Sequence, residues 1–245
     1  MFLTNGQLFL NFDKLIDVDS VLNMKPWLSA FVARNFHLIE PCRYHQKNLW
    51  TQDTALLDLS QAWQAKNSGD QVYKFVDNKQ LHRWLMFEQD LAVGNFMINL
   101  RPWVTHWTQR HLAAHCAAIA EDAQLTDFYH WLDNQKIFEQ YGSVKIFINF
   151  QHTGTLTHRD YVDLNEPSKD EFIWLGFSPH KHLYIFDPES QTKVYATGIA
   201  NYFNTNNWHG SGPSPFACYS IRVDGIFSDQ FKQRMAESQR PSRVS

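Results

Sequence analysis

Apolar and polar residues alternate with a period of two after residue 142. In the segment 144–150, Val144, Ile146, Ile148 and Phe150 share one face, which is the pattern of a strand with one buried side. Further short apolar runs, separated by turn-forming Pro, Gly, Asn and Ser, occur at 171–177, 183–186, 192–196 and 216–227. Short strands at such spacing predict an antiparallel sandwich or barrel.

The N-terminal part of the chain has a mixed pattern instead. Short strands are predicted at 7–12 and 35–40, and a helix at 20–33 that breaks or begins at Pro26, because proline lacks the backbone N–H. Apolar residues at helical spacing predict three further helices, at 79–91, 103–119 and 127–138. We therefore expect a mainly β protein with additional helices.

The length of the chain, 245 residues, suits one structural domain, for which three parts are expected. Residues 1–141 are predicted to form a mixed α/β layer that packs on the core and shapes the substrate pocket. Residues 142–228 are predicted to form the β core, and residues 229–245 a polar C-terminal tail.

Composition and charge narrow the classes of partner. The chain has 22 Lys and Arg against 25 Asp and Glu, a balance that makes nucleic acid an unlikely partner. Its three cysteines lie far apart without a Cys-x-x-Cys pair, which argues against a disulfide scaffold or zinc finger and favours a reducing compartment. The sequence shows no basic leader and no run of 18 apolar residues, so we expect a cytoplasmic protein without a membrane span.

The triplet His158-Arg159-Asp160 is the first candidate for chemistry. A His-x-Asp triplet is weak evidence by itself, because chance readily produces one. This one follows the alternating strand 144–150 through a short polar segment, which places it near a strand end. Residues two apart on an extended chain point to the same side, so the imidazole and the carboxylate are expected to converge.

The candidate for a third ligand is His209, which lies 51 residues after His158 with several short strands between them. In an antiparallel barrel or sandwich, this separation brings the chain back to the end of the sheet at which His158 lies. Two histidines and one carboxylate on one face of an ion leave three positions open on iron(II). Those positions are needed where a bidentate co-substrate and O2 bind the same ion.

Arg222, which follows His209 by 13 residues, shares a strand face with Ser220 and Asp224. A buried arginine is costly unless it is paired, and a bound dicarboxylate would pair it through a bidentate fork. Ser220 would then add a hydroxyl donor. The alternative is a structural ion pair of Arg222 with Asp224 or Asp187.

Together, His158, Asp160, His209 and Arg222 resemble the His-x-Asp…His…Arg pattern of Fe(II)/2-oxoglutarate-dependent oxygenases. The order of the residues and both spacings match, and the similarity covers roughly 142–227. It implies a double-stranded β-helix, which is a jelly-roll fold, as the catalytic core, with the N-terminal part as a helical and mixed extension.

The resemblance also implies residue roles. His158, Asp160 and His209 would bind Fe(II), and Arg222 would hold the distal carboxylate of the co-substrate 2-oxoglutarate. Because the carboxylate ligand is Asp160, hydroxylation is favoured over halogenation. The Arg-x-Ser order of some members is absent, since Ser220 precedes Arg222.

Further contacts are expected around this centre. Asn149 faces into the predicted barrel and is a candidate contact to 2-oxoglutarate, together with Ser220. Arg159 and Trp208 flank metal ligands in the sequence and are candidate contacts to the substrate. The implied reaction uses O2, releases succinate and CO2, and hydroxylates a C–H bond of a small molecule, an amino acid or a peptide-like substrate. The oligomeric state does not follow from the sequence.

Two other interpretations remain open at this point. One is a non-catalytic jelly-roll binding protein. The other is a cupin-type metalloenzyme that uses His180 and His182, although Ser178 to Lys181 has the pattern of a hairpin tip. The sequence lacks Gly-x-Gly-x-x-Gly, a P-loop and Gly-x-Ser-x-Gly, which removes the main support for dinucleotide, phosphate-loop and serine-hydrolase functions.

Overall fold

The computed structural model describes residues 3, 6–35, 38–42, 95–101, 122–150, 154–160, 171–178 and 180–239. The helices predicted at 79–91 and 103–119 lie outside the described residues.

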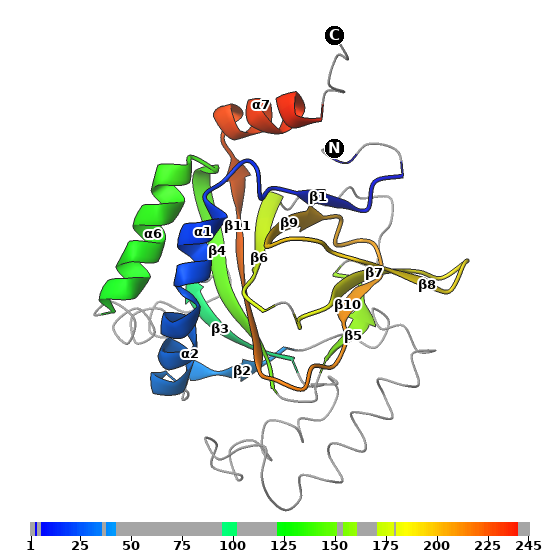
Figure 1. Ribbon diagram of the computed structural model, residues 1–245, viewed down its shortest axis with the longest axis horizontal. Coiled ribbons are helices and arrows are strands. Elements are labelled where there is room, and N and C mark those ends of the chain that lie inside the picture. Colours follow the sequence, from blue (N-terminus) through cyan, green and yellow to red (C-terminus); the bar gives the residue numbers. More distant parts are fainter. Residues whose placement is uncertain are drawn as a thin grey trace, which may run out of the picture.

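Two antiparallel sheets form the framework of the described chain (Figure 1). The larger sheet has seven strands in the order β1 (Phe9–Asn11), β9 (Ala200–Phe203), β6 (Glu171–Gly176), β11 (Cys218–Phe227), β4 (Phe138–Asn149), β3 (Asn95–Arg101) and β2 (Glu40–Pro41). The smaller sheet has the order β5 (Thr155–His158), β10 (His209–Ser211), β7 (Leu183–Asp187) and β8 (Thr192–Tyr195).

The chain moves back and forth between the two sheets from β4 onward. β4, β6, β9 and β11 belong to the large sheet, and β5, β7, β8 and β10 belong to the small one. Every strand pair is antiparallel. This arrangement is a jelly roll, and it confirms the fold class predicted from the sequence.

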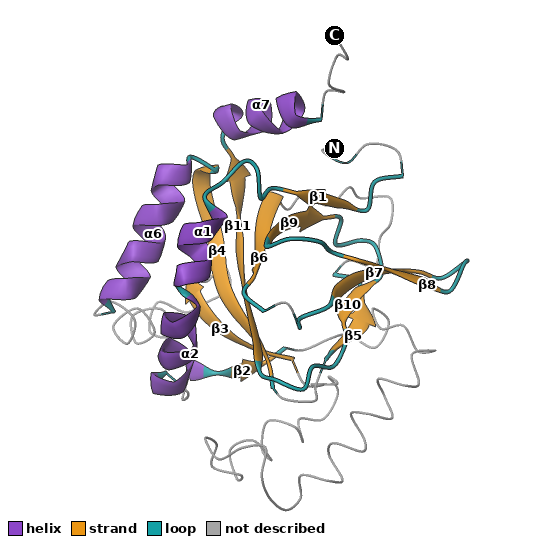
Figure 2. Ribbon diagram, in the orientation of Figure 1, coloured by secondary structure: helices purple, strands orange, loops and turns teal. Residues whose placement is uncertain are grey.

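Three helices from the N-terminal part lie on one side of the large sheet (Figure 2): α1 (Val18–Asn23), α2 (Lys25–Arg34) and α6 (Ala123–Gln135). Met24 separates α1 from α2, and Pro26 lies in the first turn of α2, so the predicted break is confirmed. Their buried apolar side chains, such as Phe31 and Phe128, join the core against the sheet.

The N-terminal part also contributes strands to the large sheet. The strand predicted at 7–12 is β1, and the strand predicted at 35–40 is reduced to the two residues of β2. β3 was not predicted, and it pairs with β4 along most of its length. The first 141 residues therefore extend the sheet as well as covering it.

The last predicted helix begins and ends earlier than expected. Asp122 caps α6 by accepting hydrogen bonds from the backbone N–H groups of Gln124 and Leu125. Lys136 has a φ of 53°, a left-handed conformation that ends the helix. Phe138, predicted as the last helical residue, is instead the first residue of β4.

The expected polar tail at 229–245 contains a helix. α7 (Asp229–Ser238) begins at Ser228, whose side chain accepts a hydrogen bond from the Phe231 N–H. Phe231 and Met235 lie on one side of α7 and are buried. These two apolar residues, four apart, hold α7 against the core, whereas the sequence predicted only a polar tail for this segment.

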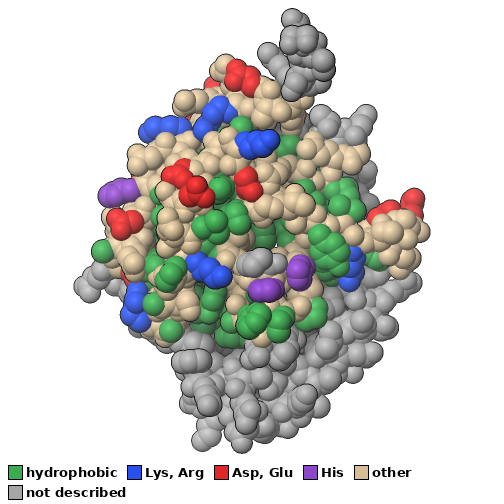
Figure 3. All heavy atoms as spheres, in the orientation of Figure 1, with side chains coloured by type: hydrophobic (Ala, Val, Ile, Leu, Met, Phe, Trp, Pro, Cys, Tyr) green, Lys and Arg blue, Asp and Glu red, His purple; other side chains and the backbone are tan. Residues whose placement is uncertain are grey.

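Within the described residues, none of the helices has the length and apolar character needed to cross a bilayer. On the face drawn in Figure 3, acidic and basic side chains are interspersed, in keeping with the small net charge.

Candidate metal centre

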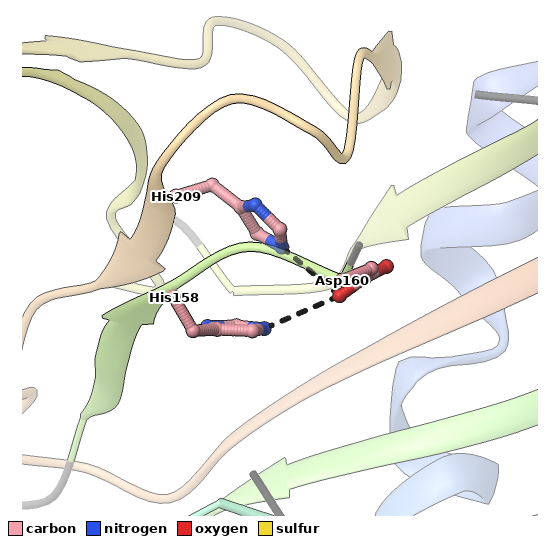
Figure 4. A group of neighbouring side chains, drawn as sticks. All are labelled: His158, Asp160 and His209. Atoms are coloured by element: carbon pink, nitrogen blue, oxygen red, sulfur yellow. Dashed lines mark ion pairs between the residues drawn. The ribbon is translucent and has the colours of Figure 1, made fainter. Parts of the chain in front are cut away.

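Strand pairing brings the predicted metal ligands together (Figure 4). His158 is the last residue of β5, and His209 is the first residue of β10. The two strands are antiparallel neighbours in which His158 and His209 are direct partners, so both rings lie on the same face. Asp160 follows β5 by two residues and points between the two rings.

The three side chains are close enough to share one ion. Asp160 Oδ1 lies 3.5 Å from His158 Nε2 and 3.7 Å from His209 Nε2. All three candidate ligand atoms lie within 4.8 Å of one another, and the ring centroids are 4.3 Å apart. These separations are near the span of a single ion with bonds of about 2.0–2.2 Å.

Both imidazoles are held in the tautomer that a metal requires. His158 Nδ1 lies 2.8 Å from the Leu156 carbonyl oxygen, and His209 Nδ1 lies 2.8 Å from the Asn207 carbonyl oxygen. A carbonyl only accepts, so each Nδ1 carries the proton and donates it, and each Nε2 presents a lone pair toward Asp160. Burial lowers the pKa of His209 to about 3, so this ring is neutral near pH 7.

Asp160 is an ionised carboxylate with one oxygen available to a metal. Burial opposes its ionisation, but the neighbouring side chains, among them the charged guanidinium of Arg222, hold the pKa of Asp160 well below its usual range. Oδ2 accepts a hydrogen bond from Arg222 Nη1 at 3.2 Å. That contact orients the carboxylate, so Oδ1 faces the two Nε2 atoms.

Arg222 is paired within the protein. Besides Asp160, it contacts Asp224 through Nε at 2.6 Å, and its guanidinium lies 4.1 Å from the centroid of the Phe172 ring. Asp224 also pairs with Lys145 at 3.5 Å. The ion pair with Asp224 that the sequence left as an alternative is thus present. A role of Arg222 in holding 2-oxoglutarate stays a prediction.

The other predicted contacts occupy different places. Ser220 is buried, and its hydroxyl has no hydrogen-bond partner among the described residues. Asn149 Nδ2 donates to Thr155 Oγ1 at 3.3 Å. Neither residue lines the cavity described below. Arg159 does line it, with its guanidinium 4.8 Å from the centroid of the Trp208 ring.

A cavity of about 350 Å³ opens between the two sheets beside the three ligands. Its walls carry apolar and aromatic side chains: Met97, Phe147, Trp174, Leu183 and Phe203. Its polar wall includes Lys181, Thr155 and Ser211.

Lys181 was not among the predicted site residues, because the sequence placed it in a solvated turn. The available signal was its alternation with Leu183 and Ile185, which marks the inward face of the following strand.

The second histidine pair predicted as an alternative metal site lies elsewhere. His180 and His182 are both exposed, and their rings contact Phe216 and Tyr195 respectively. Among the described residues, the only group of at least three potential ligands is His158, Asp160 and His209.

Gly210 allows β10 to fit between its neighbours, and its replacement gives a local test. A Cβ at Gly210 would lie 2.7 Å from Tyr184 Oη and 2.8 Å from the Thr155 carbonyl oxygen. We expect Gly210→Ala to reduce the free energy of unfolding by about 1–3 kcal/mol, the usual cost of overpacking. Because His209 is the adjacent residue, we also expect weaker metal binding in a calorimetric titration.

Gly212→Ala is the matched control for this change. The nearest heavy atom to a Cβ at Gly212 is His182 Cβ at 3.9 Å, an ordinary contact distance. Gly212→Ala should leave stability and metal affinity near the wild-type values. Equal behaviour of the two variants would show that β10 can move away from Tyr184 without disturbing His209.

Comparison with known proteins gives structural neighbours only. No protein-family model matches the chain, and no curated protein matches it. A prolyl-4-hydroxylase from Pseudomonas putida is 10% identical, with 81% of this chain and 97% of that chain covered and a TM-score of 0.31. A prolyl hydroxylase from Trichoplax adhaerens, in complex with a hypoxia inducible factor peptide fragment, is 13% identical, with coverage of 89% and 96% and a TM-score of 0.31.

An oxidoreductase of the 2OG-Fe(II) oxygenase family from Burkholderia pseudomallei is 11% identical. The alignment covers 75% of this chain and 94% of that chain, with a TM-score of 0.32. Identities of 10–13% with TM-scores of 0.31–0.32 do not establish a family for this chain. Its chemistry has to be inferred from the residues of the site.

Proposed function

We propose that this protein is an Fe(II)- and 2-oxoglutarate-dependent oxygenase that hydroxylates a C–H bond. The observation that carries the proposal is the geometry of His158, Asp160 and His209. Two Nε2 lone pairs and one carboxylate oxygen converge from one side, beside a cavity of about 350 Å³. This set leaves open positions on iron(II) for a co-substrate and O2.

The residues around the cavity fit the co-substrate. Its volume lies within the usual range for small-molecule sites, about 300–1,000 Å³. The basic side chains Arg222, Lys145, Lys181 and Arg159 all line it, and Asp160 is the one acidic residue among the lining residues described. A dianion such as 2-oxoglutarate is therefore favoured by charge.

When bound, iron and 2-oxoglutarate supply the oxidising chemistry, in which O2 is consumed and succinate and CO2 are released. The protein contributes orientation and exclusion of water. Arg222 holds Oδ2 of Asp160, and the two backbone carbonyls fix the histidine tautomers. The aromatic walls of the cavity keep water from the reacting centre.

The substrate is proposed to be a small molecule, an amino acid or a peptide-like compound. Arg159 and Trp208, which stack on each other next to the ligands, are the proposed contacts. Arg159 Nε has no hydrogen-bond partner among the described residues, so it can still bind a polar group of a substrate.

The test starts from metal-stripped protein. Under anaerobic conditions, calorimetry should show binding of Fe(II) followed by 2-oxoglutarate, and aerobic incubation should convert 2-oxoglutarate to succinate. His158→Ala should abolish both metal binding and turnover. His180→Ala, an exposed histidine of the alternative pair, should retain both.

The two alternative functions, a non-catalytic binding protein and a cupin-type metalloenzyme, predict different results in these titrations. Wild-type protein that binds neither iron nor 2-oxoglutarate would support the non-catalytic binding protein. Loss of metal in His180→Ala with retention in His158→Ala would support the cupin-type site.

A further inference from the structure

Lys181 points from the small sheet into the cavity that holds the metal ligands. It lies two residues before β7, and only 9% of its surface is exposed. Residues at every second position of a strand share a face, so Lys181 projects on the same side as Leu183 and Ile185. Ile185 is the direct partner of His209, and Leu183 is the direct partner of Ser211.

This register places Lys181 at a defined distance from the metal ligands. Four steps along the chain lead from Lys181 to Ile185, the partner of His209, which corresponds to about 13 Å at about 3.3 Å per residue. Its side chain projects into the cavity, with Nζ 6.0 Å from the centroid of the Phe147 ring on the opposite sheet. Lys181 is therefore placed to contact the end of a cavity ligand that lies away from the metal.

The ammonium group of Lys181 lacks an acidic partner. Within the described chain, no carboxylate lies within ion-pair distance of Lys181, whereas Lys145 pairs with Asp224, and Arg222 with both Asp160 and Asp224. Its nearest ring is that of Phe147, with the centroid 6.0 Å from Nζ. A buried charge without a partner is unstable unless a ligand supplies one.

Burial also affects the ionisation of this amine. It lowers the pKa of Lys181 to about 8, while the neighbouring Cys218 and Cys42 act in the opposite direction. The amine is therefore still mostly protonated near pH 7. A cation is thus present at the end of the cavity that lies away from the metal ligands.

Two hydroxyl groups lie at the same end of the cavity. Thr155 and Ser211 are partners in the pairing of β5 with β10, and both line the cavity. Thr155 Oγ1 accepts hydrogen bonds from Ser211 Oγ at 2.9 Å and from Asn149 Nδ2 at 3.3 Å. The proton of the Thr155 hydroxyl is then available to donate into the cavity.

We propose that Lys181, with the Thr155 hydroxyl, binds the distal carboxylate of 2-oxoglutarate, and that Arg222 is a positioning residue that holds Asp160. This inference rests on the proposed function and changes the role that the sequence gave to Arg222. Its basis is that Arg222 is neutralised by two carboxylates, while Lys181 has none.

The experiment compares two ligands that differ only in the distal carboxylate. Anaerobic calorimetry on Fe(II)-loaded protein measures the affinities for 2-oxoglutarate and for 2-oxopentanoate. The wild type should prefer 2-oxoglutarate by about 100-fold, as expected for a charge-assisted contact. Lys181→Met should lose most of this preference, with its affinity for 2-oxopentanoate changed by less than about threefold.

Matched variants show whether a lost preference for 2-oxoglutarate comes from Lys181 itself, from weaker Fe(II) binding or from a less stable fold. Lys14→Met, an exposed lysine outside the cavity, should behave as the wild type. Lys181→Met should keep its affinity for Fe(II) alone and should be at least as stable to heat as the wild type, because it removes a buried charge. Arg222→Met should weaken Fe(II) binding but leave the relative preference for 2-oxoglutarate.

The results distinguish this inference from the proposed function. If Lys181→Met keeps the wild-type preference, or if Arg222→Met loses it with Fe(II) affinity intact, the assignment of Lys181 is wrong and the oxygenase proposal stands. If wild-type protein binds Fe(II) but neither 2-oxo acid, the proposed function itself fails, and the assignment fails with it.

Discussion

An Asp160→Asn variant is expected to bind Fe(II) about 100-fold more weakly than the wild type, or not at all. Asp160 Oδ1 lies between the Nε2 atoms of His158 and His209 and carries the only negative charge of the three ligands. A neutral amide removes that charge. Substitutions that only support a ligand already weaken metal binding by about 10–100-fold, so loss of a ligand charge should cost more.

The same substitution should leave the fold intact. Asp160 is partly exposed, with a side-chain exposure of 27%, and Arg222 keeps its contact with Asp224 when Asp160 is neutral. Chelator competition would measure the Fe(II) affinity, and thermal unfolding would report the fold. Asp127→Asn, an exposed carboxylate on α6, is the matched control and should behave as the wild type. Wild-type Fe(II) affinity in Asp160→Asn would show that Asp160 is not a ligand.

The placement of His158, Asp160 and His209 could be predicted because strand periodicity limits the possible arrangements. An alternating strand followed by a turn puts a His-x-Asp triplet at a strand end. Short strands in an antiparallel fold return the chain to the same edge. The pairing of His158 with His209 confirms that expectation.

The strands that carry the site were harder to recognise than the strands of the core. β5 and β10 have only four and three residues, and both include polar side chains that face the cavity. Such short segments contain too few apolar positions to show a period of two. β3 does alternate, with Phe96, Ile98 and Leu100 buried, but its place beside β4 depends on contacts across the fold.

The partners of charged side chains also depended on the folded structure. The sequence indicated that Arg222 needs an anion, but not which one. Asp224 lies two residues away on the same strand face, whereas Asp160 reaches Arg222 only through the packing of the two sheets. For Lys181 the sequence did not indicate a need for an anion, because a lysine next to a turn is typical of a solvated position. The strand register shows instead that Lys181 lies in the cavity.

A Phe231→Ala variant is expected to lower the free energy of unfolding by about 3–5 kcal/mol, the usual cost of removing a buried phenylalanine. Phe231 is 0% exposed, and its ring centroid lies 5.1 Å from that of Phe12 and 5.1 Å from that of Phe227. The ring therefore joins α7 to the N-terminal segment and to the end of β11. Arg234 adds hydrogen bonds from α7 to the carbonyl oxygens of Leu15 and Gln135.

Denaturant unfolding followed by circular dichroism measures this effect, with Phe216→Ala as the matched control. Phe216 is 58% exposed, so its truncation should change the unfolding free energy by less than about 0.5 kcal/mol. Equal small losses in the two variants would show that 229–245 behaves as the polar tail that the sequence predicted. A large loss in Phe231→Ala alone would show that α7 is part of the core. Fe(II) affinity measured well below the unfolding midpoint should stay unchanged, because Phe231 contacts none of the three ligands.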